Sequence, residues 1–311
     1  MTGTAPRPAP AAPDMGEGGW HWGAAAAATF CICVWGAVPL VTKVAAQEMD
    51  GLLVGILRVV FCLPVVAVML AGRRRPVPRS WPLWRALTLV GLSSFIGFPV
   101  LFSLGQSMTT ASHGGLILAS APILTGIVAA LWHRKLPGLA WVAGAILGFA
   151  GVATLILIRA EGMPTDARPS LVGDLIVLAG VLSVAVGYVS GAQLSKTLGP
   201  ATVTFWANLV ASLLILPWAI WWLAAIDLGA VSWDTWTGIV YLAAFAQVIN
   251  FVLWYWAMEK GGIARIAAFQ FVQPVITLIL AVIFLGELMT LPLLASAALI
   301  LAGVGLCQFK R

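Results

Sequence analysis

Apolar residues dominate the chain in long runs, and the polar positions between these runs divide the sequence into ten hydrophobic segments. A helix that crosses a membrane needs about 20 predominantly apolar residues, and each segment has roughly that length. The pattern therefore predicts an all-α integral membrane protein with ten transmembrane helices. We number them as spans one to ten, over residues 22–43, 51–72, 82–105, 110–132, 138–158, 173–195, 201–223, 235–257, 263–284 and 289–308.

The two halves of the chain share one plan. Residues 122–152 align with residues 274–304 at a constant shift of 152, which places Pro122 on Pro274. Each half contains five spans, and because five is odd the second copy crosses the membrane in the opposite orientation. We therefore expect two inverted five-helix repeats with a substrate site between them near mid-membrane, as in many secondary transporters.

Composition supports this organisation. Hydrophobic residues make up 61% of the chain and charged residues only 9%, far below the roughly 25% charged residues of soluble domains; the mean hydropathy is +1.01. We expect three regions: a disordered cytoplasmic tail over residues 1–20, a first repeat over 21–160 and a second repeat over 171–309. The tail lacks the basic segment and cleavage site of a secretory signal, so span one should remain in the mature protein.

Lysine and arginine predict the orientation. The formal net charge is +6, and basic residues gather after the even-numbered spans, where the positive-inside rule places cytoplasmic loops. We therefore expect a multi-pass protein of the bacterial inner membrane with both termini in the cytoplasm. Because the membrane topology explains the positive charge, we predict no nucleic-acid partner. The expected partners are the lipid bilayer and a small-molecule substrate, and we expect a monomeric protein.

Polar side chains at membrane depth are candidates for a binding site, because they are costly unless they face the bundle interior or a wet cavity. In span eight, Gln247, Asn250 and Trp254 fall within an arc of about 60° on an α-helix. In span nine, Gln270 and Gln273 form a second amide-bearing stripe. These residues either line a substrate cavity or hold neighbouring helices together through interhelical hydrogen bonds.

The internal shift of 152 carries the span-eight positions onto Phe95, Phe98 and Phe102 of span three. One wall of the expected cavity would then form hydrogen bonds, and the opposite wall would stack against apolar parts of the substrate. The alternative is that the phenylalanine rings face lipid. We select Phe95 and Phe98 as candidate substrate-binding residues.

Four further residues within spans stand out. Trp35, followed by Gly36, either reaches the centre of the bundle or faces lipid, and Tyr188 lies beside a helix face of small residues that suits close packing. His113 either titrates near neutral pH or forms a hydrogen bond at the outer rim. Arg58 is about two turns inside span two and needs a partner or a wet path.

The sequence contains no pattern typical of an intramembrane enzyme: no HExxH, no paired membrane aspartates, and no nucleophile motif before an embedded histidine. We therefore predict no catalytic residues and no enzymatic activity. Metal-binding spacings are also missing, so we expect no metal and no cofactor. The cysteines lie inside apolar spans, where we expect free thiols: Cys31, Cys33, Cys62 and Cys307.

Residues 241–305 resemble the C-terminal repeat of the drug/metabolite transporter superfamily, EamA-type branch. The resemblance rests on the Trp-Ala-Met ending of span eight, on Pro274, on the Gly286-Glu287 pair and on Gly303-Val304. In the first half the resemblance is weaker. Trp35-Gly36, Lys43, Arg58 and Pro122 fit the family pattern, whereas Arg134 and Lys135 stand where that pattern has Gly-Glu.

The resemblance implies a basket-like fold of two inverted repeats, with a central cavity and with spans five and ten in a supporting position. It also implies a transporter similar to bacterial amino acid exporters. Because the first half lacks the Gly-Glu pair, we do not expect Glu287 to act together with a matching glutamate. We interpret Glu287 as a helix-start residue that is stabilised by the helix dipole.

Charge narrows the predicted cargo. A pump for lipophilic cations would need a carboxylate at mid-membrane, and a phosphate carrier would need clustered Lys or Arg in the cavity; neither is evident. Amides and aromatic rings suit a neutral or zwitterionic solute, so we predict export of amino acids, aromatic or bulky neutral ones above all. Export of other metabolites or drugs by proton antiport, or a membrane channel or scaffold, are the alternatives.

Overall fold

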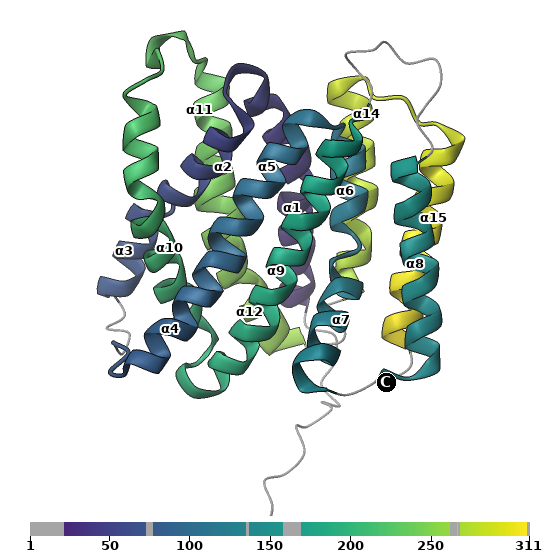
Figure 1. Ribbon diagram of the computed structural model, residues 1–311, viewed down its shortest axis with the longest axis horizontal. Helices are drawn as coiled ribbons and strands as arrows, with labels where there is room; N and C mark the ends of the chain where they lie inside the picture. The colour runs from purple at the N-terminus through teal and green to yellow at the C-terminus, as the bar shows by residue number, and fades with distance from the viewer. Residues whose placement is uncertain are drawn as a thin grey trace, which may run out of the picture.

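The computed structural model describes residues 22–72, 77–134, 137–157, 169–261, 266 and 268–309, and every regular element in these ranges is helical (Figure 1). The predicted tail, residues 1–20, lies outside the described residues. Within them, eight helices are long and apolar enough to cross a membrane, and two shorter apolar helices follow, Gln273–Leu285 and Leu291–Cys307. The all-α membrane fold expected from the hydrophobic runs is confirmed.

The first half of the chain forms spans one to five. Span one is the continuous helix α1 (Trp22–Glu48), and span five is α8 (Leu139–Leu157). The three spans between them are each divided into shorter helical pieces: α2 (Gly51–Val60) and α3 (Leu63–Gly72); α4 (Trp81–Val90), the π-helix η1 (Gly91–Gly97) and α5 (Phe98–Met108); and α6 (Ala111–Leu118) and α7 (Ala121–His133).

The second half forms spans six to ten. Spans six and seven are the continuous helices α9 (Leu171–Leu198) and α10 (Pro200–Leu223), followed by the short 3₁₀-helix η3 (Leu228–Ala230). The remaining spans are made of α11 (Trp233–Val240), the π-helix η4 (Tyr241–Ile249) and α12 (Asn250–Gly261); of the 3₁₀-helix η5 (Ala268–Val272) and α14 (Gln273–Leu285); and of α15 (Leu291–Phe309).

The helix boundaries repeat at the shift of 152 found in the sequence. Adding 152 to both ends of α7, residues 121 and 133, gives 273 and 285, the ends of α14. The same addition converts the ends of α8 into those of α15. Arg134 and Gly286, which follow α7 and α14, both adopt left-handed backbone, with φ of 52° and 63°. The sequence repeat is thus also a structural repeat.

Prolines mark the interruption in the fourth span of each repeat. Pro122 and Pro274 each occupy the first turn of a helix, α7 and α14. A proline has no N–H to donate, and the first turn of a helix is where a missing donor costs least. Span four is interrupted by a turn at residues 119–120, and in span nine the 3₁₀-helix η5 changes into α14 at Gln273.

Each repeat also carries a π-helix in its third span, η1 in the first and η4 in the second. A π-helix forms i→i+5 hydrogen bonds and has wider turns than an α-helix, and such segments are frequent at functional sites. The expectation of a regular α-helix in span eight is wrong between Tyr241 and Ile249. Apolar runs cannot reveal this difference, because both helix types bury similar side chains.

Helices α8 and α15 lie side by side at one edge of the bundle (Figure 1). Their approach depends on glycine, since a Cβ added to Gly303 of α15 would lie only 2.3 Å from the backbone nitrogen of Gly148 in α8. Small residues allow membrane helices to pack backbone against backbone. The pair joins span five of the first repeat to span ten of the second.

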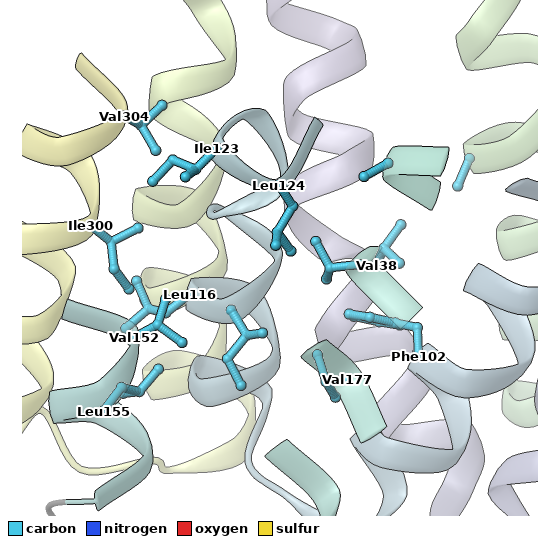
Figure 2. Packing of buried hydrophobic residues seen from close by; sticks show 14 of the residues in the cluster. Val38, Phe102, Leu116, Ile123, Leu124, Val152, Leu155, Val177, Ile300 and Val304 are labelled. Atoms are coloured by element: carbon cyan, nitrogen blue, oxygen red, sulfur yellow. The ribbon is translucent and has the colours of Figure 1, made fainter. Parts of the chain in front are cut away.

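The buried core continues from this pair toward the centre of the bundle. Ile123 projects from α7 toward Ile300 and Val304 of α15, and Phe102 of α5 lies near Val38 of α1 (Figure 2). Both repeats contribute side chains to this one cluster. In a bilayer, such close van der Waals packing replaces the hydrophobic driving force of soluble proteins.

Candidate functional site

Trp35, near the middle of α1, joins the two repeats. Its indole Nε1–H donates to the carbonyl of Ala246 in η4 at 2.9 Å. Its ring makes edge-to-face contacts with Phe251 and Trp254 of α12, at centroid distances of 5.3 and 5.2 Å. Trp35 therefore contacts protein, and the alternative of a lipid-facing ring is wrong.

Asn250 and Tyr241 connect span eight to the same helix. The Nδ2 amide of Asn250 donates to the carbonyl of Cys31 at 3.0 Å, and the hydroxyl of Tyr241 donates to the carbonyl of Val34 at 2.6 Å. The Oδ1 atom of Asn250 is buried and has no hydrogen-bond partner among the described residues. One acceptor oxygen at this interface is thus unused.

Gln247 faces a different helix. Its Nε2 amide donates to Oδ1 of Asn208 in α10 at 3.0 Å, and Asn208 in turn donates to the carbonyl of Thr204 at 3.0 Å. Gln247 and Asn250 were expected on one face, yet they contact α10 and α1. The wider turns of η4, which contains Gln247 and ends just before Asn250, account for the difference. Oε1 of Gln247 is also buried without a partner in the described part of the chain.

The two candidate phenylalanines lie in different surroundings. Phe95 is buried in an apolar cluster with residues of α2, α4 and α10, including Ile56 and Leu87. Phe98 is partly buried, and its ring centroid lies 5.3 Å from that of Phe102. The alternative of a lipid-facing ring is therefore wrong for Phe95.

Arg58 lies in the last turn of α2 and is only 4% exposed. Its guanidinium carbon is 5.6 Å from the centroid of the Phe98 ring, within the range of a cation–π contact. Tyr188 of α9 and Tyr241 of η4 are among the ionisable side chains that interact with it electrostatically. Tyr188 itself is 44% exposed. The structure thus brings Tyr188 and Phe98 together around Arg58.

The span-nine amides do not join the residues around Trp35. Gln270 in η5 is exposed, and Gln273 at the start of α14 is partly buried. Thr277 of span nine forms a hydrogen bond to α1, since its hydroxyl donates to the carbonyl of Gly36 at 2.7 Å. Gly36 packs tightly here, since an added Cβ would lie 2.7 Å from Cγ2 of Ile276.

His113 belongs to a separate group at one end of the bundle. Its Nδ1 atom lies 2.9 Å from Oδ2 of Asp174 in the first turn of α9, and Thr109 donates to Oδ1 of Asp174 at 2.5 Å. Asp174 is 1% exposed and His113 is 8% exposed. His113 thus forms a hydrogen bond at a span end, and its partner is a buried carboxylate of the other repeat.

Glu287 completes this group. Its two carboxylate oxygens accept hydrogen bonds from the backbone N–H groups of Ala111 at 2.6 Å and Ser112 at 2.9 Å, at the start of α6. A carboxylate at a helix N-terminus is stabilised by the dipole, as expected for Glu287. The helix, however, is α6 of the first repeat and not the helix that follows Glu287 in the chain. We call Thr109, His113, Asp174 and Glu287 the clasp.

The clasp closes its end of the bundle. The cavity beside it measures about 20 Å³, far below the roughly 300 Å³ at which ligand pockets begin. Another bond between the repeats lies at the same end, from the backbone N–H of Ser232 to Glu48 at 2.8 Å. Across the described ranges, no three His, Cys, Asp or Glu side chains are grouped so that they could hold a metal ion.

Two of these polar partners were not among the sequence candidates. Asn208 is an amide inside an apolar run, so the criterion that selected Gln247 and Asn250 also applies to it. Asp174 lies one turn inside span six, and its position close to a span end concealed that it is buried. A carboxylate within an apolar segment was the available signal.

Comparison with known proteins also identifies two matching halves in this chain. The sequence profile of the EamA-like transporter family matches residues 21–157 and again residues 171–307. The uncharacterized transporter YdeK of Bacillus subtilis is 28% identical over 257 residues, which cover 79% of this chain and 83% of the relative. A protein of Streptantibioticus cattleyicolor, named a probable terminal-alkyne amino-acid exporter, is 26% identical over 250 residues, covering 78% and 80%.

A solved crystal structure has a similar fold. Its TM-score is 0.60 at 18% sequence identity, and the match covers 93% of this chain and 99% of that one. At this identity the similarity concerns the fold alone. The match extends over both halves of the chain.

Proposed function

Because this chain belongs to the EamA-like transporter family, we propose that it exports a zwitterionic amino acid with a bulky apolar side chain. Membership of the family makes it a membrane transporter of small molecules built from two inverted repeats. The solute would cross by alternating access, as the two repeats rock around a site between them. We place it as a monomer in a bacterial inner membrane, with both termini in the cytoplasm.

The contact between α1 and α12 is the observation that carries this proposal. Asn250 donates to the carbonyl of Cys31, and the ring of Trp35, which also lies on α1, makes an edge-to-face contact with Trp254 of α12. An unused amide oxygen and a group of aromatic rings therefore share one interface between the repeats. An ammonium group donates to amide oxygens and is attracted to ring faces, and the rings also accept an apolar side chain.

The clasp is consistent with one state of an alternating-access cycle. It joins α6 to α9 and α6 to Glu287, two residues after the end of α14, so these bonds link the two repeats. In the proposed orientation, the clasp lies on the outer side of the membrane. The protein would then be closed to the outside, and release of the solute would require these bonds to break.

Proton-coupled export of the same solute is a second candidate. The His113–Asp174 pair is a buried contact between the repeats, whereas the sequence had indicated no buried carboxylate able to carry a proton. The contact would have to break and re-form during each transport cycle, and protons would move inward as the solute moves outward. A pH gradient would then drive the solute outward.

Flux in proteoliposomes tests the proposal. Purified protein is reconstituted, and efflux of labelled L-phenylalanine, L-leucine and L-alanine is followed with and without a pH gradient. We expect saturable efflux that favours phenylalanine and that falls several-fold in Asn250→Ala. Gln193→Ala is the matched control, because this amide is bonded to His133 at an exposed position. Wild-type protein without flux for any amino acid would overturn the proposal.

A further inference from the structure

Arg58 is a buried cation, and two of its three guanidinium nitrogens have no acceptor among the described residues. Its Nε and Nη1 atoms are both buried, and neither has a hydrogen-bond partner among the described residues. Arginine stays protonated in proteins, so these atoms carry hydrogens that point into the bundle without an acceptor. Such an arrangement is unfavourable, since buried charges are normally paired and hydrogen-bonded.

No carboxylate is among the described ionisable side chains recorded as interacting with Arg58. These are Cys62, Tyr188 and Tyr241, and a protonated thiol or phenol carries no charge that could neutralise a guanidinium. In the described part of the chain, the recorded contact between a basic and an acidic side chain is the one between His113 and Asp174, in the clasp. The ring of Phe98 provides a cation–π contact but accepts no strong hydrogen bond.

The backbone adds a second, partial compensation. Helix α2 ends at Val60, and a turn at residues 61–62 separates it from α3. Arg58 therefore lies at the C-terminal, electronegative end of a helix that stops inside the membrane. Interrupted helices whose ends point into the bundle are typical of ion and substrate sites in transporters.

The position of Arg58 is fixed by close helix packing. A Cβ added to Gly55, one turn before Arg58, would lie 2.6 Å from the Cα atom of Val100 in α5. This contact presses α2 against the helix that carries Phe98. Cys62 holds the following turn, since its thiol donates to the carbonyl of Ala243 in η4 at 3.3 Å. Arg58 is thus enclosed by elements of both repeats.

We propose that Arg58 binds the carboxylate group of the transported solute. A guanidinium presents several N–H donors in a planar fork that matches a carboxylate, and two of its donor atoms here lack an acceptor. A single cation suits one negative charge better than a phosphate, which carries about two. The rings of Phe98 and Tyr241 would lie against the apolar part of the solute.

This inference rests on the proposed function and makes it more specific. It assigns the carboxylate of the amino acid to Arg58 of the first repeat, while the ammonium group is assigned to amide oxygens of the second. The transporter would accordingly reject amines and amides of the same shape. Monocarboxylates without an ammonium group would still bind.

Ligand binding to the purified full chain tests the inference. Calorimetry is used to measure L-phenylalanine, L-phenylalaninamide and 3-phenylpropionate with the wild type, R58Q, R58K and K196Q. Lys196→Gln is the matched control, because it removes one positive charge at an exposed site. We expect the wild type and K196Q to bind both carboxylates about tenfold or more tightly than the amide, as the loss of a charge-assisted hydrogen bond implies.

The variants separate the possible outcomes. Loss of carboxylate binding in R58Q, with partial retention in R58K, supports the site. Unchanged carboxylate preference in R58Q overturns it. Should R58Q fail to fold, equal wild-type affinity for phenylalanine and its amide still contradicts the inference, and a preference for phenylalanine that weakens in R58K supports it.

The design also separates this inference from the proposed function. If the wild type binds 3-phenylpropionate through Arg58 but moves no amino acid in proteoliposomes, the carboxylate site is supported and amino acid export is not. If amino acids are transported with unchanged kinetics in R58Q, export is supported and the Arg58 site is overturned. If the wild type binds no carboxylate in the panel, the site is overturned.

Discussion

His113 of the first repeat and Asp174 of the second lie 2.9 Å apart, from Nδ1 to Oδ2, at the closed end of the bundle. This contact helps to hold the clasp end of the bundle closed, and opening of that end can be measured. Asp174 also accepts a hydrogen bond from Thr109, so a single carboxylate holds two residues of the other repeat. Removing its charge should therefore weaken the clasp.

We predict that Asp174→Asn opens the clasp end more often. Hydrogen bonds to charged groups contribute about 1.5–3 kcal/mol, and about 1.4 kcal/mol changes an equilibrium tenfold. A cysteine at Leu116, which is fully buried in α6, reports the opening. In a Cys33→Ser background, an impermeant maleimide should label this thiol about tenfold faster in Asp174→Asn.

Asp234→Asn serves as the control for this prediction. Asp234 lies in the first turn of α11 and is exposed, so its change from carboxylate to amide leaves the clasp intact. Equal labelling rates in the two variants would show that Asp174 does not hold the end closed.

Glu287 should stabilise the fold through the start of α6. Because its carboxylate binds two backbone N–H groups at 2.6 and 2.9 Å, Glu287→Ala leaves both without that acceptor. We expect a loss of about 1–3 kcal/mol, seen as a lower unfolding temperature in detergent. Glu287→Gln should lose less, since an amide oxygen still accepts one bond. The assignment fails if alanine and glutamine are equally stable.

Trp35 should affect transport through its hydrogen bond. Trp35→Phe keeps a ring against Trp254 but leaves the carbonyl of Ala246 in η4 without its 2.9 Å donor. We predict several-fold slower efflux with normal membrane insertion. Trp218→Phe is the comparison, because Trp218 is largely exposed in α10. Equal activity of both variants would remove Trp35 from the site.

The edge pair α8–α15 should be needed for stability more than for solute choice. Gly303→Ala places a Cβ 2.3 Å from the backbone nitrogen of Gly148, and overpacking of this kind costs about 1–3 kcal/mol. Gly138→Ala meets nothing within 4 Å and should be neutral. A normal unfolding temperature for Gly303→Ala would contradict the packing account, as would a change in the order of preferred solutes.

The hydrophobic pattern and the repeat shift were enough to predict most of the fold. They located the spans, and Pro122 and Pro274 corresponded to the starts of α7 and α14, because a proline constrains its own backbone locally. The residues that follow the two helices, Arg134 and Gly286, are also related by the shift of 152. Both adopt left-handed backbone, although only one of them is glycine.

The partners of the polar residues could not be predicted in this way. His113 and Asp174 are 61 residues apart in the chain, and Gln247, which contacts Asn208, lies in a π-helix that the apolar pattern does not reveal. Such pairings depend on how helices pack, which a single sequence does not encode position by position. The sequence selected the polar residues, and the packing determined which of them meet.

Solute counterflow tests most directly the central claim that an amino acid passes through a site between the repeats. Proteoliposomes loaded with unlabelled L-phenylalanine are diluted into a trace of the labelled compound. We predict a transient accumulation of label inside, greatly reduced in Asn250→Ala and retained in Gln193→Ala. Accumulation that is equal in wild type and Asn250→Ala, or missing in the wild type, would contradict the account.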